Sequence, residues 1–147
     1  MDNWFGWLLF LAAAWFLSKP LRDGFRSGLS DDADLQPADF SLEVVGESNY
    51  QKALIQVAGP KRKESANVFV TAEVICEDGN PHDSYAVRVD VQGKTVGYLS
   101  REAARIWRKG VSSTRITCSA VIRGGWDRGS GDQGHYGIWL KPPTEFK

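Results

Sequence analysis

The sequence predicts a mainly β domain, a small closed barrel or sandwich of about six short strands with two brief helices, preceded by an N-terminal transmembrane helix. Three observations lead to this prediction. Short runs of alternating apolar and polar residues, separated by turn-forming residues, recur between residues 41 and 140. Two stretches, 47–58 and 100–109, show helical spacing instead. The chain begins with an uncharged apolar segment.

The apolar segment runs from Trp4 to Leu17 and reads WFGWLLFLAAAWFL. It is apolar on every side, as a membrane-spanning helix is. As a helix it covers about 21 Å, and flanking residues extend it toward the hydrocarbon thickness of about 30 Å. A signal peptide cleaved near Ala12–Ala14 is an alternative, which the absence of a preceding basic residue disfavours. A buried or interfacial helix is a further alternative.

Charges beside this segment predict its orientation. Basic residues follow it and none precedes it, namely Lys19, Arg22 and Arg26. The positive-inside bias therefore places the C-terminal domain in the cytoplasm, as part of a single-pass cell-membrane protein. We divide the chain into a transmembrane helix (1–19), a flexible linker (20–40), a folded domain (41–141) and a tail (142–147).

The linker and the folded domain differ in charge. The net charge is zero for the whole chain, but residues 1–39 carry −3 and residues 40–147 carry +3. An acidic run at 31–34 is most simply a solvated spacer, because it lacks the glycine and the glutamate of a calcium-binding loop. The modest basic excess of the domain allows an anionic partner.

The domain divides into elements at its glycines, prolines and polar loops. Ser100 stands where the N-cap of the second helix belongs. On that helix Arg101, Arg105 and Arg108 fall on one face, which is either solvated or an anion-binding stripe. The basic loop 61–63 is either a solvated turn or a phosphate contact. The expected strands are 41–46, 67–75, 86–91, 95–99, 114–122 and 136–140.

One stretch resembles a known family. Glu77-x-x-Asn80-Pro81-His82-Asp83-x-x-Ala86-Val87-x-Val89, followed by Val96-Gly97-Tyr98-Leu99-x-x-x-x-Ala104, is similar to the HIRAN domain. The similarity covers residues 41–140. It implies a barrel related to the OB-fold. Such domains occur in certain helicase-like ATPases and alone in bacterial proteins, and this chain is expected to be of the stand-alone kind, with the membrane anchor that its apolar segment predicts. Family members often have Tyr where this chain has His82, and Asn where it has Tyr85.

The resemblance implies binding of DNA, notably a single-stranded end. Proteins hold single strands by stacking bases on aromatic rings and by placing cations along the backbone. Stacking is expected from the rings of Tyr50, His82 and Tyr98. Asn80 and Asp83 are expected to contact a base edge or a terminal hydroxyl. Arg101 is expected to contact a phosphate. Asn80 and Asp83 are alternatively turn-forming residues, and Tyr98 a packing residue. The candidate binding residues are Tyr50, Asn80, His82, Asp83, Tyr98 and Arg101.

We expect no catalysis, no cofactor and no metal site. The chain has no P-loop pattern, and its two histidines, His82 and His135, stand apart without a zinc-binding motif. A His82-Asp83-Ser84 triad is disfavoured because neighbouring residues on a strand point to opposite faces. The two cysteines, Cys76 and Cys118, are expected to be free thiols in strands.

The sequence thus predicts a membrane-anchored nucleic-acid-binding module that recognises single-stranded DNA or DNA ends. The alternative is a membrane-tethered adaptor that binds a protein or peptide through the same groove. A hydrolase is the third and least favoured possibility.

Overall fold

The structure is a computed structural model that describes residues 35–144. The predicted membrane segment Trp4–Leu17, most of the predicted linker and the end of the tail lie outside the described residues. Within residues 35–144, no helix is long and apolar enough to cross a membrane.

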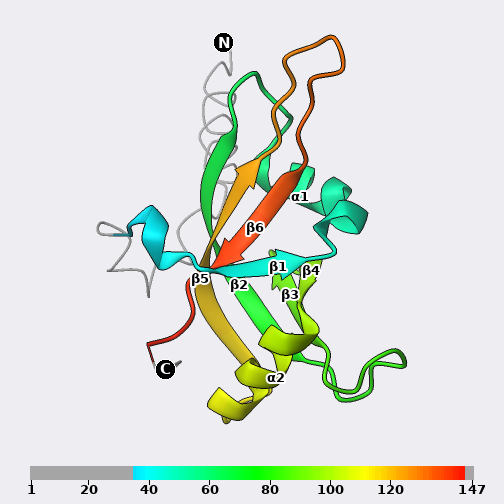
Figure 1. The fold of residues 1–147 in the computed structure, drawn as a ribbon, viewed down its shortest axis with the longest axis vertical. Helices are drawn as coiled ribbons and strands as arrows, with labels where there is room; N and C mark the ends of the chain where they lie inside the picture. The colour runs from blue at the N-terminus through cyan, green and yellow to red at the C-terminus, as the bar shows by residue number, and fades with distance from the viewer. Residues whose placement is uncertain (1–34, 145–147) are drawn as a thin grey trace, which may run out of the picture. The chain divides into compact units, whose positions relative to one another are not determined.

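The described strands close into a barrel in the order β1-β4-β3-β2-β5-β6, and all neighbours are antiparallel (Figure 1). The prediction of a mainly β fold with about six strands is confirmed, and the fold is a barrel rather than a sandwich. The strands are β1 (Leu42–Val45), β2 (Ala66–Cys76), β3 (Val87–Val91), β4 (Lys94–Leu99), β5 (Arg115–Gly124) and β6 (Tyr136–Leu140).

Two short helices accompany the barrel, as predicted. A 3-10 turn, η3 (Glu47–Tyr50), leads into α1 (Gln51–Ala58), and α2 (Arg101–Gly110) follows β4. The side chain of Ser100 accepts a hydrogen bond from the Ala103 amide (3.2 Å) and so caps α2. In Figure 1, α2 and the β2–β3 loop lie at one end of the barrel, and α1 and the β5–β6 hairpin lie toward the other.

Buried and outward-facing residues alternate along the strands and so separate the inside of the barrel from the outside. On β3, Val87, Val89 and Val91 are buried, while Arg88 and Asp90 face outward. The apolar set of each strand fills the interior because the side-chain period of a strand is two. The helices add Leu54 and Trp107, both with no exposed surface, to the same core.

The chain approaches the barrel through a short 3-10 turn, η2 (Pro37–Asp39). Phe40, which the sequence placed in the linker, is buried against Phe69 of β2 at a ring-centroid distance of 5.6 Å. Lys141 also reaches Asp39 at 3.5 Å. The packed region therefore begins a few residues before β1.

Both cysteines are free thiols. Cys118 lies on β5, and burial raises the pKa of its thiol from 9.0 to about 12. Burial also raises the pKa of the Cys76 thiol at the end of β2, although the charge of Arg108 acts in the opposite direction. Both side chains stay protonated at neutral pH, as small apolar residues in strands do.

Candidate functional site

The loop between β2 and β3 is organised by its own side chains. The Asn80 amide donates to Glu77 (2.8 Å), and its oxygen accepts from the backbone of His82 (2.9 Å). Asp83 Oδ1 accepts from the Tyr85 amide (2.8 Å). Asn and Asp favour turns because their short side chains bond backbone groups nearby. Asn80 and Asp83 therefore shape this loop, whatever else they bind.

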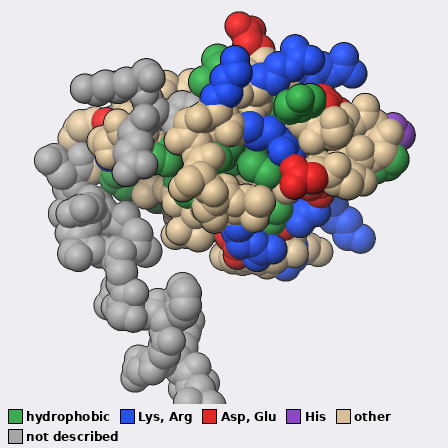
Figure 2. Space-filling view, turned by 90° about the horizontal axis from the view of Figure 1, so that it is seen from below, with side chains coloured by type: hydrophobic (Ala, Val, Ile, Leu, Met, Phe, Trp, Pro, Cys, Tyr) green, Lys and Arg blue, Asp and Glu red, His purple; other side chains and the backbone are tan. Residues whose placement is uncertain are grey.

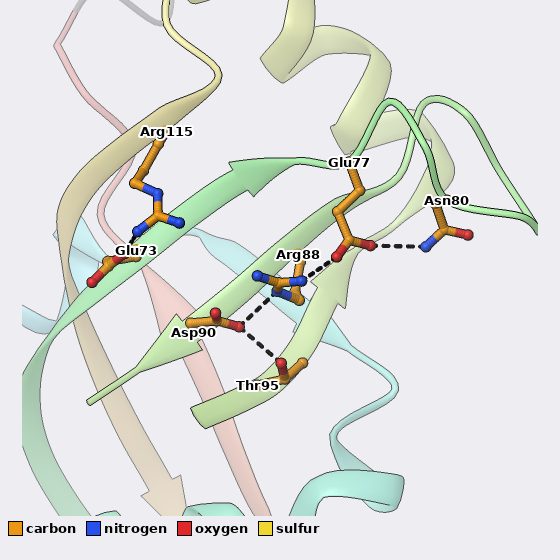
Figure 3. Close-up of polar contacts among 7 residues, drawn as sticks. All are labelled: Glu73, Glu77, Asn80, Arg88, Asp90, Thr95 and Arg115. Atoms are coloured by element: carbon orange, nitrogen blue, oxygen red, sulfur yellow. Dashed lines mark hydrogen bonds and ion pairs between the residues drawn. The ribbon is translucent and has the colours of Figure 1, made fainter. Parts of the chain in front are cut away.

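A polar chain joins this loop to the outer face of the barrel (Figure 3). Arg88 on β3 donates to Glu77 and, through Nε, to Asp90 Oδ1 at 3.0 Å. Thr95 on β4 donates to the same Asp90 oxygen at 2.9 Å. Burial tends to lower the pKa of Arg88, but Asp90 and Glu77 raise it overall. Arg88 is thus a partly exposed cation whose charge is balanced by Glu77 and Asp90.

Arg108 joins α2 to the same loop. Its guanidinium donates to the backbone oxygens of Tyr85 and Ala86, both at 3.0 Å, and to Asp78 at 2.6 Å. Its side chain is only 18% exposed. The predicted three-arginine stripe is therefore divided, because Arg108 is committed to the loop while Arg101 and Arg105 are exposed.

Tyr50 and Tyr98 form an aromatic pair on the outside of the barrel. Their ring centroids are 6.3 Å apart and both residues are partly exposed. Tyr98 stands opposite Val45 of β1 and Arg88 of β3. Burial raises the pKa of the Tyr98 phenol, and Glu77 and Tyr50 raise it further, so the hydroxyl is neutral at physiological pH.

Asp83 and Arg101 form a second pair at the start of α2. Arg101 Nε lies 3.9 Å from Asp83 Oδ2, and the Arg101 side chain is 82% exposed. His82 is exposed in the loop that projects from the barrel in Figure 1. The structure thus pairs Tyr50 with Tyr98 and Asp83 with Arg101. Asn80 lies within the β2–β3 loop.

Cations stand on the surface around this end of the molecule. Figure 2 looks at the barrel from below and shows Lys and Arg side chains with Asp and Glu between them. Among the exposed cations are Arg101, Arg105 and Lys109 of α2 and Arg115 of β5. Arg115 is paired with Glu73 at 2.7 Å, whereas Arg101 is held only by the longer contact to Asp83.

A hollow that the sequence did not reveal lies where the β5–β6 hairpin leaves the barrel. Its volume is about 560 Å³, and its wall includes Trp126 of the hairpin and Trp139 of β6. The Arg123 guanidinium lies 5.5 Å from the centre of the Trp139 ring, and that of Arg128 lies 5.6 Å from the Trp126 ring. The sequence placed Trp126 and Arg128 in one glycine-rich loop but gave no sign that Trp139 joins them.

The scan against protein-family models decides the family. The HIRAN domain model matches residues 39–127, which is more than half of the chain. The chain belongs to the HIRAN domain family. At the level of the family, membership indicates nucleic-acid binding. The match includes the β2–β3 loop and Tyr98 and ends before β6. No curated protein and no solved structure matches the chain significantly.

Proposed function

We propose that this HIRAN protein binds single-stranded DNA, including strand ends, and does so without catalysis while tethered to a membrane. The observation that supports it best is the partly exposed Tyr50–Tyr98 pair on the outside of the barrel. Bases stack on such rings whatever their sequence, and nearby cations neutralise the phosphates.

The second pair suggests where a strand end binds. Asp83 has one oxygen bonded to the Tyr85 amide and the other facing Arg101. A carboxylate accepts a hydrogen bond from a terminal hydroxyl but repels a phosphate. Arg101, exposed at the first turn of α2, is suited to the neighbouring phosphate instead. Asn80 supports this contact indirectly by shaping the loop.

The membrane tether is proposed from the sequence. The segment Trp4–Leu17 is uncharged and rich in aromatic residues, and the basic residues Lys19, Arg22 and Arg26 follow it. This arrangement is that of a single-pass anchor with the barrel on the cytoplasmic side. Single-stranded DNA would then be bound close to the inner surface of the membrane.

Binding is tested with the full chain in a mild non-ionic detergent and a fluorescent single strand of about ten nucleotides, a length within the range one OB fold covers. Anisotropy should show binding at low salt that weakens as salt rises, since phosphate contacts release counterions. Tyr98→Ala should cost about 1–3 kcal/mol of binding free energy, the usual contribution of one stacked base.

The matched control is Ile106→Ala, which removes a 55% exposed apolar side chain from α2. It should bind like the wild type. The proposal fails if the folded wild-type chain binds no single strand at low salt. Capture of a protein partner that survives nuclease treatment and is lost in Tyr98→Ala would support an adaptor role instead.

A further inference from the structure

The two tryptophans of the hollow pack closely against glycines. A side chain built at Gly137 would come within 2.7 Å of the Trp139 ring, and one at Gly134 within 2.4 Å of the Trp126 ring. Contacts this short show that each indole packs directly on the backbone. Trp126 is further fixed by the hydrogen bond from its Nε1 to Asp132 (3.0 Å). The hollow is therefore a built surface with aromatic walls held in place.

Strand register places Trp139 on the same outer face as Tyr98. Both stand beside β1, where Tyr98 is opposite Val45 and Trp139 is opposite Glu43. Their inward neighbours, Leu99 and Leu140, are in the core. Two residues along β1 and two strand spacings across it separate the Cα atoms of Tyr98 and Trp139 by about 12 Å.

The chemistry around the hollow suits a base and its phosphate. Arg123 and Arg128 each lie over one of the indoles, and Arg62 pairs through its backbone with Trp126. Asn67 in the wall can hydrogen-bond a base edge. Glu47 is the acidic side chain of the wall, and Asp132 beside it pairs with Arg128 at 3.5 Å. A base can stack on the planar guanidinium that the tryptophan supports, and the positive charge attracts the anionic backbone.

We propose that this hollow is a second nucleobase subsite, which takes an internal base of the strand whose other contact is Tyr98. The inference rests on the proposed binding of single strands. It adds a minimum length that a strand must have to contact both Tyr98 and the hollow. Because the two strand positions are about 12 Å apart, a strand must be several nucleotides long to contact both. A strand shorter than this reaches one platform only.

The experiment compares single strands of two, four and eight nucleotides on the full chain in detergent. In the wild type, affinity should rise sharply when the strand becomes long enough to reach both platforms. Trp139→Ala should lower the affinity for the eight-nucleotide strand roughly five- to 100-fold, the effect of losing one stacked base. It should leave the weak binding of the dinucleotide at Tyr98 unchanged.

Trp139→Phe keeps an aromatic ring and should restore most of the affinity for the long strand. If Trp139→Ala binds that strand as tightly as the wild type while Tyr98→Ala weakens it, the second subsite is refuted and the proposed function stands. If Trp139→Phe is as defective as Trp139→Ala, stacking in the hollow is refuted. If the wild type binds no strand, both proposals fall.

Discussion

Arg108 connects three backbone and side-chain oxygens of one loop to the last turn of α2. Because guanidinium donors have a fixed planar geometry, the three bonds fix the direction in which the loop leaves the barrel. The loop carries Asn80 and Asp83, and Arg108 itself does not lie among the exposed cations. Its contribution to binding is therefore the position of the loop.

Replacing Arg108 by Ala should release the loop and leave the part-buried Ala86 oxygen without this hydrogen bond. We expect a loss of about 1–3 kcal/mol in the free energy of unfolding. Amide hydrogen exchange in residues 77–86 should become faster, and binding of single-stranded DNA should weaken. Arg108→Lys should behave similarly, because an ammonium cannot reproduce the planar fork.

The matched control is Arg105→Ala on the exposed side of the same helix. It removes the same charge and should change stability by less than about 0.5 kcal/mol. Equal effects of the two alanine variants on DNA binding would show that Arg108 acts only through its charge.

Local chemistry explains which of these residues could be predicted from the sequence. The turn-forming role of Asn80 and Asp83 depends on bonds to residues two or three positions away, so it is readable from spacing. Arg108 bonds residues that are 22–30 positions distant. Helical periodicity could assign it to a face but could not show that the loop folds back onto that face.

At the scale of elements, the contact between β1 and β4 depends on Gly97. A side chain built there would come within 2.5 Å of Val44 Cγ1 and 2.8 Å of the Val45 oxygen. The two strands pair over only two registered positions, so the barrel has few other contacts at this seam. Tyr98, the next residue on β4, lies at the same seam on the outer face of the barrel.

Gly97→Ala should therefore destabilise the protein by forcing β1 and β4 apart. We expect a loss of about 1–3 kcal/mol, as for other overpacked sites. The denaturant midpoint should fall without a change in the slope of the transition. Gly79→Ala is the control, because a side chain there meets nothing within 4 Å. An unchanged midpoint for Gly97→Ala would contradict the close packing of this seam.

Period-two alternation predicted each strand, because a barrel wall separates a packed interior from solvent along its whole length. The pairing of the strands did not follow from that pattern. Tyr98 and Trp139 are 41 residues apart in sequence, and only the order β4-β1-β6 places both beside the same strand. The proximity of Tyr98 and Trp139 could therefore not be predicted from the sequence, although both residues are plainly present in it.

At the scale of the whole molecule, the opposite charges of the two parts of the chain suit a protein that binds an anion near a membrane. The negative residues 1–39 would repel DNA, whereas residues 40–147 carry the positive excess. The proposed anchor would hold the barrel within reach of the membrane. This arrangement requires the barrel to be cytoplasmic.

A reporter fused after Lys147 that works only in the cytoplasm tests this arrangement. It should be active, and the fusion should stay with the membrane fraction after a high-salt wash, because apolar insertion is not screened by salt. Replacing Lys19, Arg22 and Arg26 by Gln and adding Lys residues before Trp4 should reduce the activity, since the charge bias sets orientation. A reporter active only outside the cytoplasm would refute the topology. A mature chain that begins just after Ala14 would show instead that Trp4–Leu17 belongs to a cleaved signal peptide.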